Sequence, residues 1–400
     1  MAMTVVGNGV RHGVTGRGPT AIESGSGGDG APRTLLHIFS SFGSGGAAVR
    51  FVRLANRLGP RYRHRILALD HRRDSASLLA PELDVGFLDL EMRPGKTGVA
   101  ANLAIARRVL SRLRPDLLLS YNWGAVEWPL ANRLAPLCPS IHFEDGFGPE
   151  EADGRQIRRR VWMRRLALGG ARVVVPSRAL WSIATGVWRL PTPRVLHIPN
   201  GIDAGAVTPV TVRDAPLSEL TVGYVGALRA EKNVARLVRA LALLPPQRRP
   251  WLRVIGDGPE RPHLERLAGE LAVAERVVFT GHVADPMRLL VGCDVLALSS
   301  DTEQMPLSVL EGMAAGLPVV STDVGDVREM VAAANQALIV PKAEQPLAAA
   351  LETVLGAPAL RRALGQANRA RVEAVYNEDH MVATYDRLFA GGALPSHLPT

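Results

Sequence analysis

Residues 294–322 read DVLALSSDTEQMPLSVLEGMAAGLPVVST, a stretch that contains every part of one β-α-β unit. The apolar runs 294–298 and 318–322 are typical of buried parallel strands. Between them Pro306 favours the first position of a helix, and Gly316 favours its end. The stretch therefore predicts a strand, a polar loop, a helix and a second strand.

The same alternation of apolar runs and helical periods covers most of the chain, which indicates an α/β fold with mainly parallel sheets. The strands predicted in the first half are 35–39, 65–69, 85–88, 116–120, 140–143, 172–175 and 194–198. Those predicted in the second half are 220–226, 251–256, 276–281, 294–298, 318–322 and 337–340. Two such series predict two Rossmann-like domains facing across a cleft, because open α/β sheets bind ligands at the carboxyl ends of their strands.

The predicted domains are separated by composition and by turns. Residues 1–33 are rich in Gly, Ser and Thr and are predicted to form a disordered arm. The N-terminal Rossmann-like domain is placed at 34–203 and the C-terminal one at 204–376, with a turn at the sequence PNGID between them. Residues 377–400 are predicted to form a helix that packs back on the N-terminal domain, followed by a tail.

Length and composition exclude several classes of protein. The chain has 400 residues, 47% apolar and 21% charged, enough for more than one core without disulfides or metals. No charge-free apolar run approaches the ~20 residues of a membrane-spanning helix. With two cysteines, no secretory-type N-terminus and no closely spaced metal ligands, we expect a cytoplasmic protein without a metal or cofactor.

The net charge of +9 is uneven, because arginines dominate residues 34–200 while acids outnumber bases in 201–400. Aromatic residues make up only 5% and no nucleic-acid reader motif is present, so a nucleic-acid partner is not expected. An anionic acceptor, or contact with an anionic membrane at its inner face, stays open. The arginine-rich segment 155–165 is either a solvated basic helix or such a contact, and its apolar residues predict no insertion.

Three loops that follow predicted strands of the second half are suited to a phosphorylated ligand. Gly226 is followed by Arg229 and Lys232, whose side chains could clamp a diphosphate. Gly256 and Asp257 follow the next strand, and His282 and Val283 the one after. A solvated helix start and ordinary turns are the structural alternatives.

The loop and helix inside 294–322 carry two glutamates. Glu303 lies before the predicted helix and Glu311 inside it, so both can point to one side, and carboxylates accept hydrogen bonds from sugar or ribose hydroxyls. The backbone N–H groups near Met305, Pro306 and Leu307 lie at the helix start, where a phosphate binds well. Two solvated acids beside an ordinary helix are the alternative.

In the first half, the sequence from Gly43 to Ala48 has G-x-G-x-x-A spacing, which places Gly45 and Gly46 at a helix start suited to an anion. Asp70 lies at the end of the next strand, where a dinucleotide-binding enzyme carries the acid that binds the ribose, so a nicotinamide-dependent oxidoreductase is a second hypothesis for the chain. A tight turn without a ligand and a solvated strand end remain the structural alternatives.

Taken together, these motifs resemble the retaining glycosyltransferases of family 4, which have the GT-B fold. The resemblance covers about residues 34–390, and its specific part lies in the second half. It consists of the E-x7-E pair with an A-x-G-x-P-V-V ending, the Arg229/Lys232 pair after a G-x-L turn, the GDGP and GH turns and the PNGID linker.

The resemblance implies transfer of a sugar from a nucleotide-sugar donor to a glycan or lipid-linked acceptor in cell-envelope or exopolysaccharide assembly. Anomeric configuration would be retained without a bound metal. By the same resemblance, Arg229 and Lys232 would bind the diphosphate, Glu311 the ribose and Glu303 the sugar hydroxyls. Gly45 and Gly46 would approach the transferring sugar or its phosphates, and His282 and Val283 would border the base.

One family position is ambiguous in this chain. The family's first-domain His aligns either with His142 or, on the following glycine, with Asp145. His142 could equally be a core histidine, and Asp145 or Glu144 is favoured as the cleft-facing group because it follows the strand. The end of another strand adds predicted acceptor-binding residues, which are Tyr121, Asn122 and Trp123.

Two other functions remain as alternatives to sugar transfer. One is the nicotinamide-dependent oxidoreductase that uses the first glycine turn and Asp70. The other is a glycan-binding protein without turnover. The nucleotide, the sugar and the acceptor are not determined by these motifs.

Overall fold

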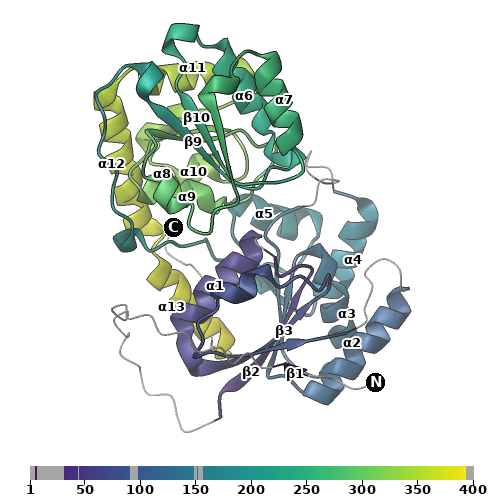
Figure 1. Cartoon of the computed structure of the whole chain (residues 1–400). Coiled ribbons are helices and arrows are strands. Elements are labelled where there is room, and N and C mark those ends of the chain that lie inside the picture. Colours follow the sequence, from purple (N-terminus) through teal and green to yellow (C-terminus); the bar gives the residue numbers. More distant parts are fainter. Residues whose placement is uncertain are drawn as a thin grey trace. The chain divides into compact units, whose positions relative to one another are not determined.

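The computed structural model describes residues 5–6, 31–43, 45–90, 98–147, 151 and 156–392 (Figure 1). The chain divides into two compact units. The first comprises Met1–Glu144 and Met163–Val173, and the second comprises Asp145–Trp162 and Val174–Thr400. Most of the predicted arm at 1–33 and the tail after residue 392 lie outside the described residues.

The strands of the first half form one sheet in the order β1-β4-β3-β2-β5-β6-β7-β8. Their bounds are β1 Val5–Val6, β2 Arg33–Phe39, β3 Tyr62–Ala68, β4 Asp84–Leu88, β5 Leu117–Tyr121, β6 Ser140–Phe143, β7 Arg172–Val175 and β8 Val195–His197. Strand β2 pairs in parallel with β3 and β5, and β1 pairs antiparallel with β4. All seven predicted strands are present, whereas the two-residue β1 was not predicted.

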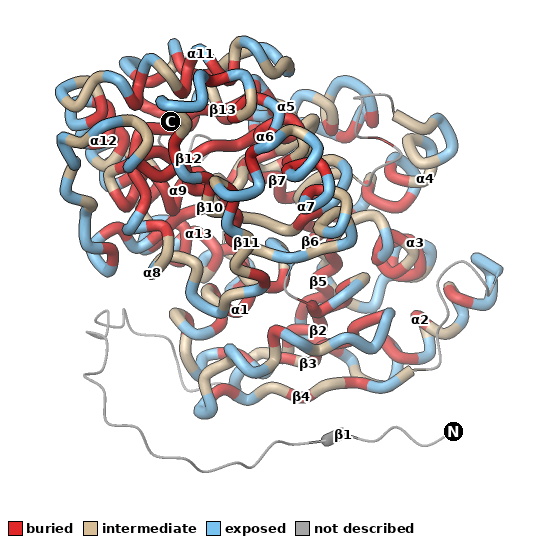
Figure 2. The backbone as a smooth tube through the Cα atoms, turned by 45° about the horizontal axis from the view of Figure 1, so that its top comes forward, coloured by how far each residue is buried: buried red, intermediate tan, exposed pale blue. Residues whose placement is uncertain are grey.

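Helices connect these strands as the alternating pattern predicts. Their bounds are α1 Gly46–Leu58, α2 Val99–Leu113, α3 Glu127–Leu134, α4 Arg158–Leu168 and α5 Arg178–Ser182. The central strands β2 and β5 are buried over most of their length (Figure 2). The ring of Tyr121 at the end of β5 stacks between Phe39 and Phe143, at centroid distances of 3.9 and 4.8 Å. These strands therefore form the core of the first unit.

A polar chain runs through this core beside the aromatic rings. His37 Nδ1 lies 3.0 Å from Tyr121 Oη, and His37 Nε2 lies 3.0 Å from His64 Nδ1. Both histidines are fully buried, and His64 Nε2 has no hydrogen-bond partner among the described residues. Burial lowers the pKa of His64 to about 4 and lowers that of His37 well below its ordinary value. Both rings are therefore held neutral at pH 7.

The second sheet has the order β11-β10-β9-β12-β13-β14, and all its pairs are parallel. Its strands are β9 Thr221–Val225, β10 Trp251–Ile255, β11 Val277–Gly281, β12 Val295–Leu298, β13 Val319–Thr322 and β14 Ile339–Val340. This is the doubly wound order, in which the chain reverses direction across the sheet between β9 and β12. The six predicted strands of the second half are confirmed.

The helices of the second half pair on the sheet, with α6 beside α11 and α9 beside α12 (Figure 1). Their bounds are α6 Val234–Leu243, α7 Arg261–Glu270, α8 Met287–Leu290, α9 Leu307–Ala314, α10 Val327–Met330, α11 Glu344–Leu355, α12 Pro358–Val375 and α13 Glu378–Phe389. Pro306 is the N-cap of α9 and not its first residue, because its ψ of 126° is extended. Gly316, with φ of 72°, ends this helix as predicted.

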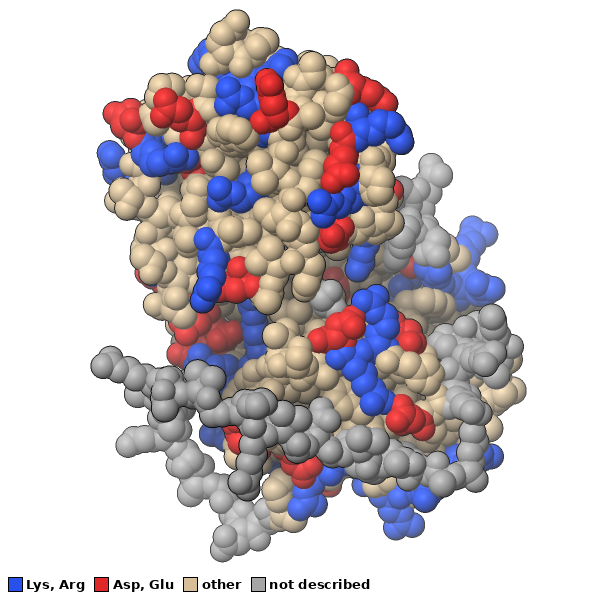
Figure 3. Space-filling view, in the orientation of Figure 1, with Lys and Arg blue, Asp and Glu red and all other residues tan. Residues whose placement is uncertain are grey.

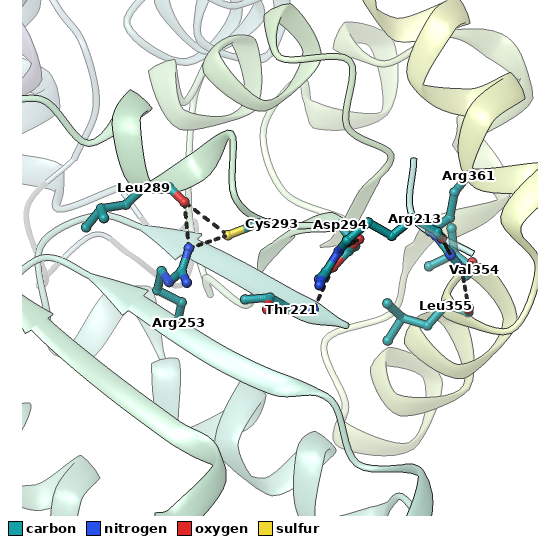
Figure 4. Close-up of polar contacts among 9 residues, drawn as sticks. All are labelled: Arg213, Thr221, Arg253, Leu289, Cys293, Asp294, Val354, Leu355 and Arg361. Carbon is teal, nitrogen blue, oxygen red and sulfur yellow. Dashed lines mark hydrogen bonds and ion pairs between the residues drawn. The ribbon is translucent and has the colours of Figure 1, made fainter. Parts of the chain in front are cut away.

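The segment that leads into the second sheet is held by an arginine clamp (Figure 4). Arg213 Nε donates to Asp294 Oδ1 at 3.0 Å, and the backbone N–H of Thr221 donates to Asp294 Oδ2 at 2.7 Å. The buried Arg361 donates to the Arg213 carbonyl at 2.6 Å and to the carbonyls that end α11. One buried carboxylate thus fixes the entering segment to the start of β9.

Both cysteines are free thiols. Burial raises the pKa of Cys138 and of Cys293 to about 11. Both thiols are therefore protonated and weakly nucleophilic at neutral pH.

The two buried histidines predict an acid-sensitive first unit. Because their folded-state pKa values lie below the unfolded value of about 6.5, the stability gained by keeping them neutral is present above pH 6.5 and is lost as pH falls toward 4. The shift of His64 alone corresponds to about 3 kcal/mol. Guanidinium unfolding between pH 7 and pH 4 should show this loss, and it should be smaller in His64→Leu.

The matched control replaces His380, an exposed histidine on α13, by Gln. Its unfolding curve should follow that of the unchanged protein at every pH. Equal acid sensitivity in His64→Leu and the unchanged protein would contradict the role given to the buried pair.

Candidate functional site

The candidate site of the second unit lies where β9 and β12 end. These strands are neighbours in the sheet, but the chain leaves them in opposite directions, and such a switch point is where open α/β sheets bind their ligands. The loop after β9 carries Arg229 and Lys232, and the loop after β12 carries Glu303. The sheet order therefore brings residues far apart in sequence to one place.

Lys232 and Glu303 are in direct contact there. Lys232 Nζ donates to both carboxylate oxygens of Glu303, at 2.6 and 2.8 Å, and Ser300 Oγ donates to Glu303 Oε1 at 2.7 Å. The side chains are 24% and 9% exposed, respectively. An ion pair in such a partly buried position is stronger than one in water. The two residues assigned to opposite ends of a donor thus neutralise each other in this structure.

The two loops are joined by further polar contacts that the sequence did not suggest. Asp301 accepts from Asn233 Nδ2 at 3.0 Å and from Arg236 Nη2 at 2.7 Å. Arg236 also donates to the carbonyl of Ser299 at 2.7 Å. Asn233 has φ of 42° and caps the start of α6 with its side chain. These contacts fix the backbone on both sides of the Lys232–Glu303 pair.

Arg229 is placed differently from Lys232. Its side chain is 57% exposed and lies 3.8 Å from Glu231, so it remains open to solvent. Together with Asn233, Arg239 and His263 it lines a pocket of ≈ 250 Å³ beside the start of α6. The two residues of the predicted pair therefore differ: the Lys232 ammonium is in an ion pair, whereas the Arg229 guanidinium is exposed to solvent.

Helix α9 begins at Leu307, four residues after Glu303. Glu311 is a buried residue of this helix, and Met305, before it, is also buried. The carbonyl of Met305 accepts from Asn200 Nδ2 at 3.0 Å. Pro306 and Leu307 stand at the start of the helix and are half-buried. Because this helix follows β12, its N-terminus and Glu303 both lie on the chain that leaves the carboxyl end of that strand. The segment is thus anchored between its two glutamates.

The glycine turns are explained partly by the fold itself. A Cβ on Gly256, whose φ is 142°, would overlap the carbonyl oxygen of Gly226. The same two loops are joined by a hydrogen bond from the Leu228 N–H to the Asp257 carbonyl, at 2.9 Å. Close approach of two backbones therefore demands Gly256, without any ligand. The exposed His282 and half-buried Val283 follow Gly281 on the neighbouring β11.

The turn after β13 also contributes to the site and was missed from sequence. Gly325 has φ of 53°, and a Cβ there would overlap the carbonyl oxygens of Glu303 and Gln304. The carboxylate of the buried Asp326 accepts from the backbone N–H groups of Arg178 and Ala179, at 2.5 and 3.0 Å. A Gly-Asp turn at the end of a parallel strand was the signal that could have identified it.

Gln304 connects this loop to other parts of the second unit. Its side-chain oxygen accepts from Ser177 Oγ at 2.8 Å. A Cβ on Gly146 would lie 3.5 Å from Gln304 Cγ, so the half-buried Asp145 and Gly146 pass beside the residue that follows Glu303. Of the two candidates for the family's histidine position, Asp145 is therefore the one placed near this loop.

In the first unit, Gly45 and Gly46 are at the start of α1, where Gly45 is the N-cap. A Cβ on either glycine would meet nothing within 4 Å. The fold itself therefore does not require glycine at these positions, in contrast to Gly256. Open space at the N-terminus of a 13-residue helix fits the predicted close approach of an anionic group.

His142 and Glu144 are both fully buried in the first unit. His142 Nδ1 lies 2.9 Å from Ser120 Oγ, its Nε2 lies 3.4 Å from Glu144 Oε2, and Arg164 Nε donates to the same oxygen at 3.3 Å. Both ring nitrogens of His142 therefore have partners, as in a core histidine.

The residues at the end of β5 are less exposed than predicted. Tyr121 is 4% exposed, because its ring belongs to the aromatic stack of the core. Asn122 has φ of 58° and Trp123 packs under the guanidinium of Arg164, 5.0 Å from the ring centroid. Of the three, Asn122 and Trp123 are half-buried and remain partly accessible for the predicted acceptor contact.

Two family models match the chain in succession. Residues 44–205 match Glycosyltransferase Family 4, and residues 212–371 match Glycosyl transferases group 1. Among curated proteins, 2-deoxystreptamine N-acetyl-D-glucosaminyltransferase of Streptomyces fradiae is 30% identical over 281 residues, which is 62% of this chain and 64% of that protein. The lipopolysaccharide core biosynthesis glycosyltransferase LpsE of Rhizobium meliloti is 29% identical over 44% of this chain and 52% of that protein.

The chain thus spans about half to two thirds of the length of these relatives. Among solved structures, that of Anabaena Alr3699/HepE in complex with UDP and glucose has a TM-score of 0.75 and 20% identity. It covers 90% of this chain and all of that protein. The predicted α/β GT-B fold with two Rossmann-like domains is confirmed.

The contrast between the two kinds of glycine predicts opposite effects on stability. Gly256→Ala should lower the free energy of unfolding by about 3 kcal/mol, because the methyl group overlaps a carbonyl and the φ of 142° disfavours any side chain. Gly46→Ala should leave stability unchanged or raise it slightly, since alanine favours a helix over glycine. Guanidinium unfolding followed by circular dichroism measures both. A loss of stability in Gly46→Ala as large as in Gly256→Ala would contradict this assignment.

Proposed function

We propose that this chain, whose two halves match a Glycosyltransferase Family 4 model and a Glycosyl transferases group 1 model in succession, transfers a sugar from a nucleotide-diphosphate donor to an acceptor hydroxyl. The observation that carries this proposal is the contact of Lys232 with Glu303 at the switch point of the second sheet. An ammonium and a carboxylate at this place match the two ends of a sugar diphosphate.

Binding of the donor would break this ion pair, and the donor would then contact both Lys232 and Glu303. Its diphosphate replaces Glu303 as the partner of Lys232, and its sugar hydroxyls donate to the released carboxylate. Arg229, already exposed to solvent, adds a second positive charge, and the start of α9 adds backbone N–H groups. The buried Glu311 is assigned to the ribose.

We assign a retaining mechanism without a bound metal to this site. The bond between the anomeric carbon and the leaving phosphate oxygen breaks, and the acceptor oxygen bonds to the same face of that carbon. The acceptor proton passes to the leaving phosphate oxygen. The protein contributes orientation of the reactants and stabilisation of the charge that develops on the diphosphate, chiefly through Lys232.

The acceptor is proposed to be a glycan or a lipid-linked sugar of the cell envelope or of an exopolysaccharide, modified in the cytoplasm. The Rhizobium relative, named for lipopolysaccharide core biosynthesis, supports this class. The Streptomyces fradiae relative is named for 2-deoxystreptamine, so a small polar acceptor is the second candidate. The predominance of arginine in residues 34–200 favours an acceptor that carries phosphate or carboxylate groups.

Lys232→Ala should lower kcat/KM for sugar transfer at least ~100-fold, because it removes a contact to the charge that develops on the leaving group. Circular dichroism and unfolding curves should confirm that the fold is retained. Arg288→Ala, at a side chain that is 85% exposed on α8, is the matched control and should leave transfer unchanged. Transfer by Lys232→Ala within threefold of the unchanged protein would contradict the proposal.

A calorimetric titration with UDP, GDP, ADP and NAD(H) separates the competing functions. We expect one nucleoside diphosphate to bind and NAD(H) not to bind, with weaker diphosphate binding in Lys232→Ala. Binding of NAD(H) alone would favour the oxidoreductase. Diphosphate-sugar binding without hydrolysis or transfer to any acceptor would favour a glycan-binding protein.

The anomeric outcome tests the retaining mechanism. With an α-linked donor, proton NMR of the product should show an α linkage, and transfer should persist in EDTA. A β-linked product would contradict retention, and full loss of transfer in EDTA restored by a divalent cation would contradict metal independence.

A further inference from the structure

A pocket of ≈ 250 Å³ lies beside α6 and α7, and all its lining residues belong to the second unit. Its lining includes Arg229 and Ala230 from the turn before α6, Arg239 from α6 itself, and Glu260 and His263 from the start of α7. Neither residue of the ion pair in the candidate site is among the lining residues that the structure describes. The pocket is therefore a separate feature from that ion pair, and we call it the α6–α7 pocket.

The two guanidinium groups of this pocket have unused hydrogen-bond donors. Arg229 Nη1 lies 3.8 Å from Glu231 Oε1, and Arg239 Nη1 lies 3.9 Å from Glu344 Oε1, so both distances exceed the length of a hydrogen bond. Within the part of the chain that the structure describes, neither side chain has a further polar contact. Arg236, on the same helix, instead donates two hydrogen bonds of 2.7 Å. Both guanidinium groups of the pocket can therefore donate to a ligand.

The other charged side chains of α7 neutralise one another. Arg261 Nε lies 2.8 Å from Glu265 Oε1, and Arg266 Nε lies 3.4 Å from Glu270 Oε1. Figure 3 shows blue and red side chains next to one another at the place that α7 has in Figure 1. Of the residues that the structure describes, Glu260 is the one acid that lines the pocket, against two arginines. The pocket therefore has a net positive charge.

The remaining lining residues and the volume restrict what the pocket can hold. Val234 and Ala235 begin α6, where backbone N–H groups have no acceptor within the helix, and the buried Leu264 adds an apolar wall. His263 Nδ1 lies 3.0 Å from Arg266 Nη2, so Nδ1 accepts and the neutral ring carries its hydrogen on Nε2. The volume is below the ~300–1,000 Å³ of sites for drug-sized ligands. The occupant is therefore an anion smaller than a nucleotide sugar.

We propose that the α6–α7 pocket binds a small phosphomonoester that carries hydroxyl groups, such as a sugar phosphate. Its phosphate is held by Arg229 and Arg239, because guanidinium groups make bidentate contacts with phosphate oxygens. Its hydroxyl groups donate to the carboxylate of Glu260, and His263 Nε2 donates to one of its oxygens. Inorganic phosphate would place a second negative charge beside Glu260 without offering it these hydroxyl donors. The pocket therefore prefers the phosphomonoester to the free ion.

Occupation of the pocket has a consequence for sugar transfer, and this part rests on the proposed function. There Arg229 also contacts the diphosphate of the donor, and one guanidinium cannot hold phosphates at two places. Lys232 and Asn233 follow in the same short segment, and Asn233 itself lines the pocket. A bound phosphomonoester therefore weakens donor binding and raises the KM for the donor, while kcat at saturating donor is unchanged.

Calorimetric titration of the full chain with glucose 6-phosphate and with glycerol 3-phosphate tests the pocket. We expect one molecule of at least one of them to bind with a Kd below ~1 mM, and inorganic phosphate and glucose to bind at least ~10-fold more weakly. Arg239→Gln should weaken phosphomonoester binding at least ~10-fold, because hydrogen bonds from a charged donor are lost. The matched control is Arg248→Gln, at an arginine of similar exposure that pairs with Glu352, and it should bind as the unchanged protein.

The same titrations separate this pocket from the donor site. Arg239→Gln should leave basal transfer and the binding of UDP, GDP and ADP unchanged. Lys232→Ala should weaken nucleoside diphosphate binding and leave phosphomonoester binding unchanged, whereas Arg229→Gln should weaken both. In transfer assays, the bound phosphomonoester should raise the KM for the donor at least ~5-fold in the unchanged protein and not in Arg239→Gln.

Three results would overturn the proposal. They are no saturable binding of either phosphomonoester up to ~10 mM, equal binding in Arg239→Gln and the unchanged protein, and loss of phosphomonoester binding in Lys232→Ala. The last result would place the phosphate at the donor site. Inorganic phosphate that binds as tightly as the phosphomonoesters would contradict the role given to Glu260. Binding is measured without donor or acceptor, so failure here is distinguishable from failure of the proposed transfer.

Discussion

The ion pair of Lys232 and Glu303 depends on one topological fact, the reversal of strand order between β9 and β12. Without that reversal, both loops would lead to helices on the same face of the sheet, and their side chains would not meet. The surrounding contacts hold this geometry. Asp301 ties the loop after β12 to the start of α6, and Gly325 lets the β13 turn approach the Glu303 backbone. The order of the strands thus brings the two loops together, and the side-chain contacts then hold them in place.

Much of the fold followed from sequence because apolar runs and helical periods are local signals. All thirteen predicted strands are present, and Gly316 ends α9 as expected. Burial was harder to predict, since it depends on neighbours distant in sequence. Tyr121 was expected at a ligand site and instead stacks between Phe39 and Phe143 in the core. The strand was predicted to end near Tyr121, and it does, but the local sequence does not show on which side of the sheet the ring lies.

The glycines show the same limit of sequence-based prediction, because their roles also depend on neighbours that are distant in sequence. Gly256 and Gly46 both occur in turns after strands, and sequence alone gave them the same meaning. In the structure, the backbone of a neighbouring loop demands the first, while the second faces open space. The Asp326 carboxylate was missed for a similar reason, because its partners are backbone groups more than a hundred residues away. Ligand-facing and fold-required residues become separable only when the packing is known.

The protonated state of the two native thiols has a practical consequence. Cys138 and Cys293 have pKa values raised to about 11, so a maleimide near pH 7 reacts with them slowly. A single cysteine engineered on a solvated helix would therefore take a fluorophore selectively, without deleting either native residue. Pairs of such labels, one in each compact unit, would report by energy transfer on the distance between the units in solution.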